Sequence, residues 1–230
     1  PNGFRLNARG LWHRDRYETF ADRVELEYLR TENWSPARLQ ARGRLPRDVR
    51  DRRVALVGVG ALGSALADML VRAGVKDIAL VDGDLLEAGN VCRHLATLSD
   101  VGKRKVEVVA QRLRAISPTV QVTEMDERLS ADPKTIVGQF DEYEIIIDCT
   151  ASDEALALLA LPWWPVPRVF ASFSLAYGGK RLFSLGVCGH RFPQQEFFTS
   201  VRPWLKYDAK VRADSEEVLD WVANRPGAIG

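Results

Sequence analysis

Residues Arg53–Arg93 read RVALVGVGALGSALADMLVRAGVKDIALVDGDLLEAGNVCR, and this stretch decides the fold. The apolar run 54–57 predicts a buried strand, residues 58–63 form a G-x-G-x-x-G turn, and a helical pattern follows. A second apolar run, 78–81, predicts the next strand and leads directly to Asp82. Strand, glycine turn, helix, strand and acid follow one another in the order that a nucleotide-binding βαβ unit requires.

The residues of the glycine turn have separate tasks in such a unit. Gly58 permits the tight turn, Gly60 lets a phosphate approach the backbone, and Gly63 lets the helix pack against the strand. Ala61 and Leu62 begin the helix, where unpaired backbone N–H groups and the helix dipole favour an anion. The sequence therefore predicts that these five residues bind a nucleotide through its phosphates.

Polar residues beyond the second strand extend this pattern. Asp82 is expected to accept hydrogen bonds from ribose hydroxyls, and Asp84 follows it two residues later. Arg93 can clamp a phosphate through two parallel bonds, Lys105 can supply a compact positive charge, and Asn90 can position a phosphate oxygen or an attacking group. A dehydrogenase that binds NAD does not need these groups. An enzyme that binds a nucleoside triphosphate does, because the charge of the triphosphate must be spread as its α-phosphorus is attacked.

The rest of the chain alternates between helical and strand patterns. We expect helices over 98–117, 133–140, 153–161 and 216–223, and strands over 120–125, 144–149, 168–174 and 181–187. Gly178-Gly179 makes a short turn between the last two strands, so that pair should be antiparallel. The predicted fold is α/β: a Rossmann-like, doubly wound, mostly parallel sheet with an antiparallel strand pair near the C-terminal end. Its binding residues should converge beyond the carboxyl ends of the strands.

Two parts are expected along the chain. Residues 1–51 are rich in arginine and lack lysine, and helical spacing over 17–29 predicts an amphipathic extension. Acids are interspersed among the arginines, so a nucleic-acid-binding arm is disfavoured. Residues 52–230 form the nucleotide-binding domain, which we expect to be truncated at its C-terminus. The chain begins at Pro1, which leads us to expect a piece of a longer protein.

Bulk composition narrows the class of protein. With 46% hydrophobic and 27% charged residues in 230, the chain can bury the core of a soluble α/β domain. A net charge of +1 gives no bias toward nucleic acid or a membrane surface, and no apolar run is long enough to span a membrane. Three cysteines without a C-x-x-C pair argue for a reducing cytoplasm and against a structural zinc site.

The motifs G-x-G-x-x-G, VDGDLLEAGNVCRH, GKRK and IIIDCT, taken together, resemble the ThiF/MoeB/HesA superfamily, the adenylating domain shared with ubiquitin-activating enzymes. The resemblance covers roughly Arg52–Val187. It implies that Asp82 holds the ATP ribose and that Asn90, Arg93 and Lys105 address the phosphates. The implied reaction is adenylation of the C-terminal glycine of a ubiquitin-like or sulfur-carrier protein, by an enzyme that commonly forms a homodimer.

The chain departs from the family pattern at two positions. His94 stands where Gln is usual, and Ala151 stands where the family has the Asp that binds Mg²⁺ in D-C-T-D-N. Because Ala151 cannot ligate a metal, Asp153 must reach in as the Mg²⁺ ligand, or the site is weakened. A non-catalytic ThiF-like scaffold therefore remains an alternative, and so does an NAD-binding Rossmann oxidoreductase.

Several side chains have a plain structural explanation beside the functional one. A solvated charged surface competes with phosphate binding for the run KRK at 103–105. Cys149 is expected to pack in the core. Cys188 has a histidine, His190, two residues on, but we favour a structural role for it over a thioester-forming one. Packing or surface positions are likewise expected for His190 and His94.

Overall fold

The computed structural model describes residues 4–6, 8–10, 12–14, 29, 31–41, 43–176 and 179–213. The chain divides into two compact units, residues 1–38 and 39–230. The first contains an antiparallel strand pair, β1 (Phe4–Leu6) and β2 (Trp12–Arg14), which the sequence did not predict. The helices predicted over 17–29 and 216–223 fall on residues 15–28 and 214–230, outside the described ones but for Leu29. The division at residues 51 and 52 stays a prediction.

The second unit is built on a six-stranded sheet with strand order β5-β4-β3-β6-β7-β8. Its strands are β3 (Arg53–Val57), β4 (Asp77–Val81), β5 (Gln121–Met125), β6 (Ile145–Asp148), β7 (Arg168–Ala176) and β8 (Arg181–Gly189). The first five in this order are parallel, and only β8 runs antiparallel to its neighbour β7. This arrangement confirms the predicted fold class.

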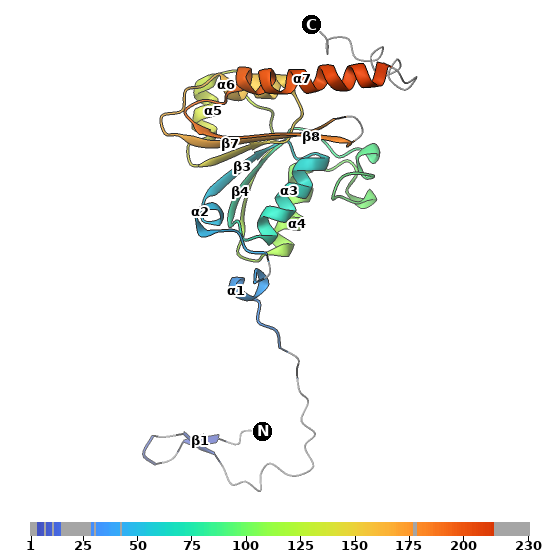
Figure 1. The fold of residues 1–230 in the computed structure, drawn as a ribbon. Coiled ribbons are helices and arrows are strands. Elements are labelled where there is room, and N and C mark those ends of the chain that lie inside the picture. Colours follow the sequence, from blue (N-terminus) through green and yellow to red (C-terminus); the bar gives the residue numbers. More distant parts are fainter. Residues whose placement is uncertain are drawn as a thin grey trace. The chain divides into compact units, whose positions relative to one another are not determined.

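Helices cover both faces of this sheet. The helices of the described residues are α1 (Pro36–Leu39), at the boundary of the two units, and α2 (Arg47–Arg50), α3 (Ala61–Arg72), α4 (Lys105–Ile116), α5 (Pro133–Phe140), α6 (Asp153–Ala160) and α7 (Gln194–Ala213). Figure 1 shows α3 and α4 on one face and α5, α6 and α7 on the other. None of the described helices is long and apolar enough to cross a membrane.

The strands β3 and β4 are buried on both faces, as their continuous apolar runs predict. Val54 and Leu56 pack with α3 and α4 in one core cluster, whereas Ala55 and Val57 pack with α5 and α6 in the other. Both clusters extend along the central strands to their carboxyl ends, where Val57 and Val81 belong to one cluster and Val59 and Cys149 to the other. The loops at that edge of the sheet therefore begin directly from the buried core.

Two helices differ from the sequence prediction. The segment predicted as one helix over 98–117 forms a 3₁₀ turn, η3 (Leu98–Asp100), followed by α4 from Lys105. Thr97 caps η3 and exchanges hydrogen bonds with Asp100, so the capping residues serve that short turn and not α4. Helix α7 was missed because Pro203 lies inside it and usually marks an end.

Candidate nucleotide-binding site

The glycine turn between β3 and α3 is sterically determined. Gly58 has φ +86°, and a Cβ there would lie 2.8 Å from the backbone nitrogen of Thr150. A Cβ on Gly63 would overlap the carbonyl oxygen of Gly58. A Cβ on Gly60, by contrast, would meet nothing within 4 Å. Gly58 and Gly63 thus make the turn possible, and the open side of Gly60 is what the approach of a phosphate requires.

Asp82, at the carboxyl end of β4, holds this turn in place. Its Oδ2 accepts the Val59 N–H at 2.8 Å, and its Oδ1 accepts the Asp84 N–H at 2.9 Å. Each oxygen keeps a further lone pair, so ribose binding by Asp82 stays a prediction beside this observed role. Sequence reasoning missed the contact with Val59, because the acid was interpreted only as a ligand for ribose.

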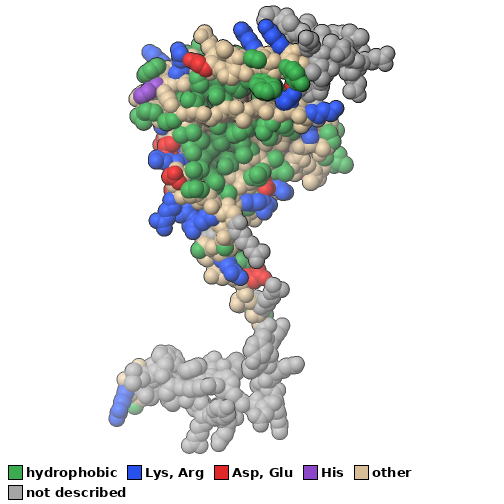
Figure 2. Space-filling model, in the orientation of Figure 1, with side chains coloured by type: hydrophobic (Ala, Val, Ile, Leu, Met, Phe, Trp, Pro, Cys, Tyr) green, Lys and Arg blue, Asp and Glu red, His purple; other side chains and the backbone are tan. Residues whose placement is uncertain are grey.

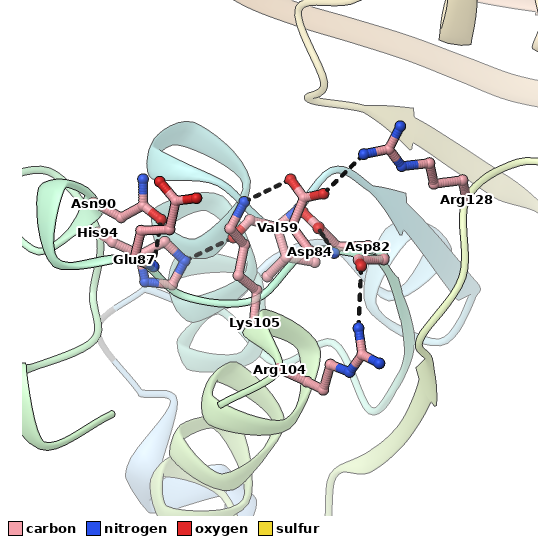
Figure 3. A network of polar contacts seen from close by, with 10 residues as sticks. Val59, Asp82, Asp84, Glu87, Asn90, His94, Arg104, Lys105 and Arg128 are labelled. Carbon is pink, nitrogen blue, oxygen red and sulfur yellow. Dashed lines mark hydrogen bonds and ion pairs between the residues drawn. The ribbon is translucent and has the colours of Figure 1, made fainter. Parts of the chain in front are cut away.

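A network of charges continues from this loop to α4 (Figure 3). Asp84 accepts hydrogen bonds from Lys105 Nζ at 2.9 Å and from Arg128 at 3.3 Å. The hydrogen bond from Lys105, more than that from Arg128, holds the pKa of Asp84 below its ordinary value. Arg104 lies beside them and donates to the Gly83 carbonyl at 3.3 Å. A continuous chain of contacts therefore links the glycine turn to Lys105.

Asn90 and Arg93 come from the 3₁₀ turn η2 (Ala88–Asn90) and the residues after it. Asn90 Oδ1 accepts the Glu87 N–H at 3.0 Å, and the Asn90 carbonyl accepts the Arg93 N–H at 3.0 Å. Asn90 thus shapes its own turn. Arg93 is exposed, and no polar partner is recorded for its side chain within the described part of the chain. It is the group in this loop best able to turn toward a ligand.

His94 makes a contact with the glycine turn that sequence reasoning missed. Its ring is buried, and its Nε2 lies 2.7 Å from the Val59 carbonyl oxygen of the glycine turn. Its Nδ1 accepts the Ala96 N–H at 3.1 Å. The packing position expected for His94 is thus confirmed, but the contact of its ring with the glycine turn was not predicted. The available signal was its place next to Arg93, where the family has a polar Gln.

The end of β6 forms the other wall of the turn. Asp148 is almost fully buried and accepts hydrogen bonds from Ser172 Oγ at 2.8 Å and from Thr150 Oγ1 at 2.7 Å. Burial raises the pKa of Asp148. Ala151 follows with φ +52°, a left-handed conformation that an alanine rarely adopts. The loop after β6 is therefore held in an unusual shape by the groups around it.

The residues that could hold Mg²⁺ were predicted around the loop after β6. Within the described residues, no group of three His, Cys, Asp or Glu side chains could hold a metal. Asp153 is exposed in the first turn of α6, after the cap Ser152, where a carboxylate also favours the helix dipole. Mg²⁺ bound to nucleotide phosphates needs as little as one protein carboxylate. The assignment of Asp153 as that ligand stays a prediction.

Cys149 lies in the core as expected, and the structural role favoured for Cys188 stays a prediction. Cys149 is buried, whereas Cys92 and Cys188 are exposed, and all three are free thiols. His190 Nδ1 lies 2.8 Å from the Trp164 carbonyl oxygen, and its ring stacks on Trp163 with centroids 5.1 Å apart. These contacts give His190 a packing role independent of Cys188.

The chain is similar in sequence to known proteins over most of its length. The ThiF family model matches residues 36–160. The ATP-dependent ubiquitin transferase-like protein Cap2 of Enterobacter hormaechei subsp. hoffmannii (strain UCI 50) is 30% identical over 210 residues, which span 90% of this chain and 35% of that protein. The adenylyltransferase and sulfurtransferase uba4 of Emericella nidulans is 39% identical over 103 residues, 44% of this chain and 21% of that protein.

A similar solved structure is the tRNA N6-threonylcarbamoyladenosine dehydratase TcdA of E. coli. It is 33% identical with a TM-score of 0.47, and the match covers 54% of this chain and 51% of that chain. The chain spans about a third or less of the length of the curated relatives named here. Because the family model covers more than half of its residues, this chain belongs to the ThiF family.

Proposed function

We propose that this protein uses ATP to adenylate the C-terminal glycine of a ubiquitin-like or sulfur-carrier protein and releases pyrophosphate. The observation that carries the proposal is the chain of contacts from Lys105 through Asp84 and Asp82 to the backbone of Val59. It ties a cation to the turn that would hold the phosphates. An enzyme that only transfers hydride to NAD has no use for that cation at this place.

The chemistry makes two demands on the site. A carboxylate oxygen of the carrier attacks the α-phosphorus, and the bond from that phosphorus to the bridging oxygen of the β-phosphate breaks as pyrophosphate leaves. Both reactants are anions, so the site must neutralise charge and hold the reacting atoms in line. Backbone N–H groups at the start of α3, with Lys105 and Arg93, supply that charge. Lys105 must exchange Asp84 for a phosphate oxygen when ATP binds.

The names of the relatives support ATP as the co-substrate. Cap2 is named as ATP-dependent, and uba4 as an adenylyltransferase. Mg²⁺ would accompany the phosphates, with Asp153 as the proposed carboxylate ligand. Three free cysteines support a reducing cytoplasm, and the family resemblance supports a homodimer. Sedimentation of the purified protein tests the last point.

One observation favours the scaffold alternative. Ala151 brings no carboxylate to the loop after β6, although the family pattern has one there. A protein that had lost Mg²⁺ binding could keep the same fold and still present a surface to carriers. Binding of ATP without any turnover would be its signature.

Exchange of radiolabelled pyrophosphate into ATP tests the proposal. The full-length protein is mixed with ATP, Mg²⁺ and a panel of glycine-ended carriers from the same genome. Lys105→Ala should lose exchange, whereas Lys103→Ala should keep it, because Lys103 pairs with Asp100 and not with the loop at Asp84. Protein that binds ATP but exchanges with no carrier would leave the scaffold as the better account. Tighter binding of NAD than of ATP would favour the oxidoreductase.

A further inference from the structure

His94 connects two loops that carry the candidate site. It follows the turn η2 and Arg93, and its ring reaches the glycine turn after β3 at the Val59 carbonyl oxygen, 2.7 Å away (Figure 3). The residue is 8% exposed, so water cannot readily replace that hydrogen bond. A buried imidazole therefore spans the gap between the turn that carries Arg93 and the turn that would hold phosphate.

The partners of the ring determine its tautomer. The Ala96 backbone N–H can only donate, so Nδ1, 3.1 Å away, must accept and carry no proton. In a neutral imidazole the proton then sits on Nε2, which donates it to the Val59 carbonyl. Both nitrogens are satisfied in this state. The ring is consequently fixed in one orientation by two opposed backbone groups.

Val59 is held on both sides as a result. Its N–H donates to Asp82 Oδ2 at 2.8 Å, and its carbonyl accepts from His94. In a trans peptide the carbonyl and the next N–H point in opposite directions. Because His94 holds the Val59 carbonyl, the Gly60 N–H of the same peptide points away from the His94 ring. No acceptor for that N–H is recorded within the described residues.

We propose that His94 is a positioning residue that aims the Gly60 N–H at a phosphate of ATP. The inference rests on the proposed function, because it assumes that ATP phosphates lie at the start of α3. Gly60 suits the task, since a Cβ there would meet nothing within 4 Å and a ligand can approach its backbone. Substrate does not touch His94 itself. Its effect passes through one peptide plane.

Two substitutions separate the two hydrogen bonds of the ring. In His94→Gln the terminal amide extends about as far as Nε2 and can still donate to the Val59 carbonyl. In His94→Asn the shorter amide can accept from the Ala96 N–H in place of Nδ1 but cannot reach Val59. Each variant therefore keeps one of the two hydrogen bonds. The glutamine variant keeps the bond to Val59 that orients Gly60, and the asparagine variant keeps only the bond to Ala96.

Calorimetry with ATP and with adenosine is the test. We expect His94→Gln to bind both ligands as the wild type does. His94→Asn should bind ATP about tenfold more weakly and adenosine unchanged, since one charge-assisted hydrogen bond is misaligned. A general structural defect would weaken both ligands together. Suppose that the wild type binds ATP more tightly than adenosine and that His94→Asn shows the same ratio of the two affinities. That result overturns this inference and leaves the proposed function standing.

The wild-type protein provides a second measurement that needs no variant. In NMR titrations the Gly60 amide proton should move downfield with ATP and stay in place with adenosine. If the chemical shift of the Gly60 amide proton does not change when ATP is added, the inference is overturned, even if a variant fails to fold. A wild type that binds ATP no more tightly than adenosine overturns the proposed function, and this inference with it.

Discussion

Gly58 lies directly against Thr150: a Cβ on Gly58 would stand 2.8 Å from the Thr150 backbone nitrogen and 2.9 Å from the Cys149 carbonyl carbon. The turn after β3 and the loop after β6 therefore touch through backbone alone. Any side chain at position 58 would push apart two strand ends that are neighbours in the sheet. The candidate site thus depends on a contact that glycine alone allows.

Gly58→Ala should destabilise the fold by about 2–5 kcal/mol, from the left-handed backbone together with the overlap. Urea unfolding of the Gly58→Ala variant and of the wild type measures this loss of stability as a difference between their midpoints. Gly60→Ala is the matched control, because that glycine has φ −75° and open space around it. The control should keep its stability and lose ATP affinity. Equal stability of the two variants would contradict the steric argument.

Arg93→Ala should leave the melting temperature unchanged, because its exposed side chain has no recorded partner in the described structure. Pyrophosphate exchange should fall by about 10²–10³-fold, the effect of losing one preorganised charge donor, or about 2–4 kcal/mol. Arg202→Ala removes another exposed arginine, from α7, and should exchange normally. If both variants lost activity equally, Arg93 would have no special role.

Ala151 offers a gain-of-function experiment. Asp adopts positive φ more readily than Ala, so Ala151→Asp should be tolerated and should tighten binding of MgATP relative to ATP alone. Ala151→Gly relieves the backbone without adding a carboxylate, and should be more stable by about 1 kcal/mol with no change toward Mg²⁺. Calorimetry with and without Mg²⁺ distinguishes the two. No Mg²⁺ effect in the aspartate variant would remove position 151 from the metal site.

Cys149 should shape the alkaline stability of the protein. Burial, and then the charge of Asp148, raises the pKa of its thiol from 9.0 to about 12. Between these values the unfolded thiol ionises and the folded one does not. Its contribution is therefore complete below pH 9, and the free energy of unfolding falls by about 1.4 kcal/mol per pH unit above it.

Urea unfolding of the wild type and of Cys149→Ala across this pH range measures that contribution as a difference in slope. Thiol labelling provides an independent check, since Cys92 and Cys188 are exposed. The native protein should react at two thiols and the denatured protein at three. Parallel slopes, or rapid labelling of Cys149 in the native state, would contradict the pKa direction.

The sequence predicted the elements whose signals are local. Continuous apolar runs and the spacing of Gly58 and Gly63 were enough to place β3, α3 and β4, because these patterns admit few other structures. Asp82 follows β4 and contacts the glycine turn after β3, in line with the expectation that residues beyond the carboxyl ends of parallel strands converge.

What the sequence did not reveal depends on tertiary contacts. The bond from His94 to Val59 forms only because the loop after η2 folds back over the glycine turn. The pairing of Lys105 with Asp84 likewise arises where the start of α4 meets a distant loop. Helix α7 survives an internal proline because Phe197 and its neighbours pack on the sheet. Local patterns carry none of this information.

The position of β3 between β4 and β6 affects how the chain folds during its synthesis. Val57 pairs with Val81 on one side and with Asp148 on the other. During synthesis the first partner emerges soon after β3, but the second follows only after a long stretch of chain. At ordinary translation rates, the edge of β3 that pairs with β6 stays unpaired for roughly 5–20 s before β6 is synthesised. An unpaired apolar edge invites aggregation, so a nascent chain of this fold is a natural client for chaperones.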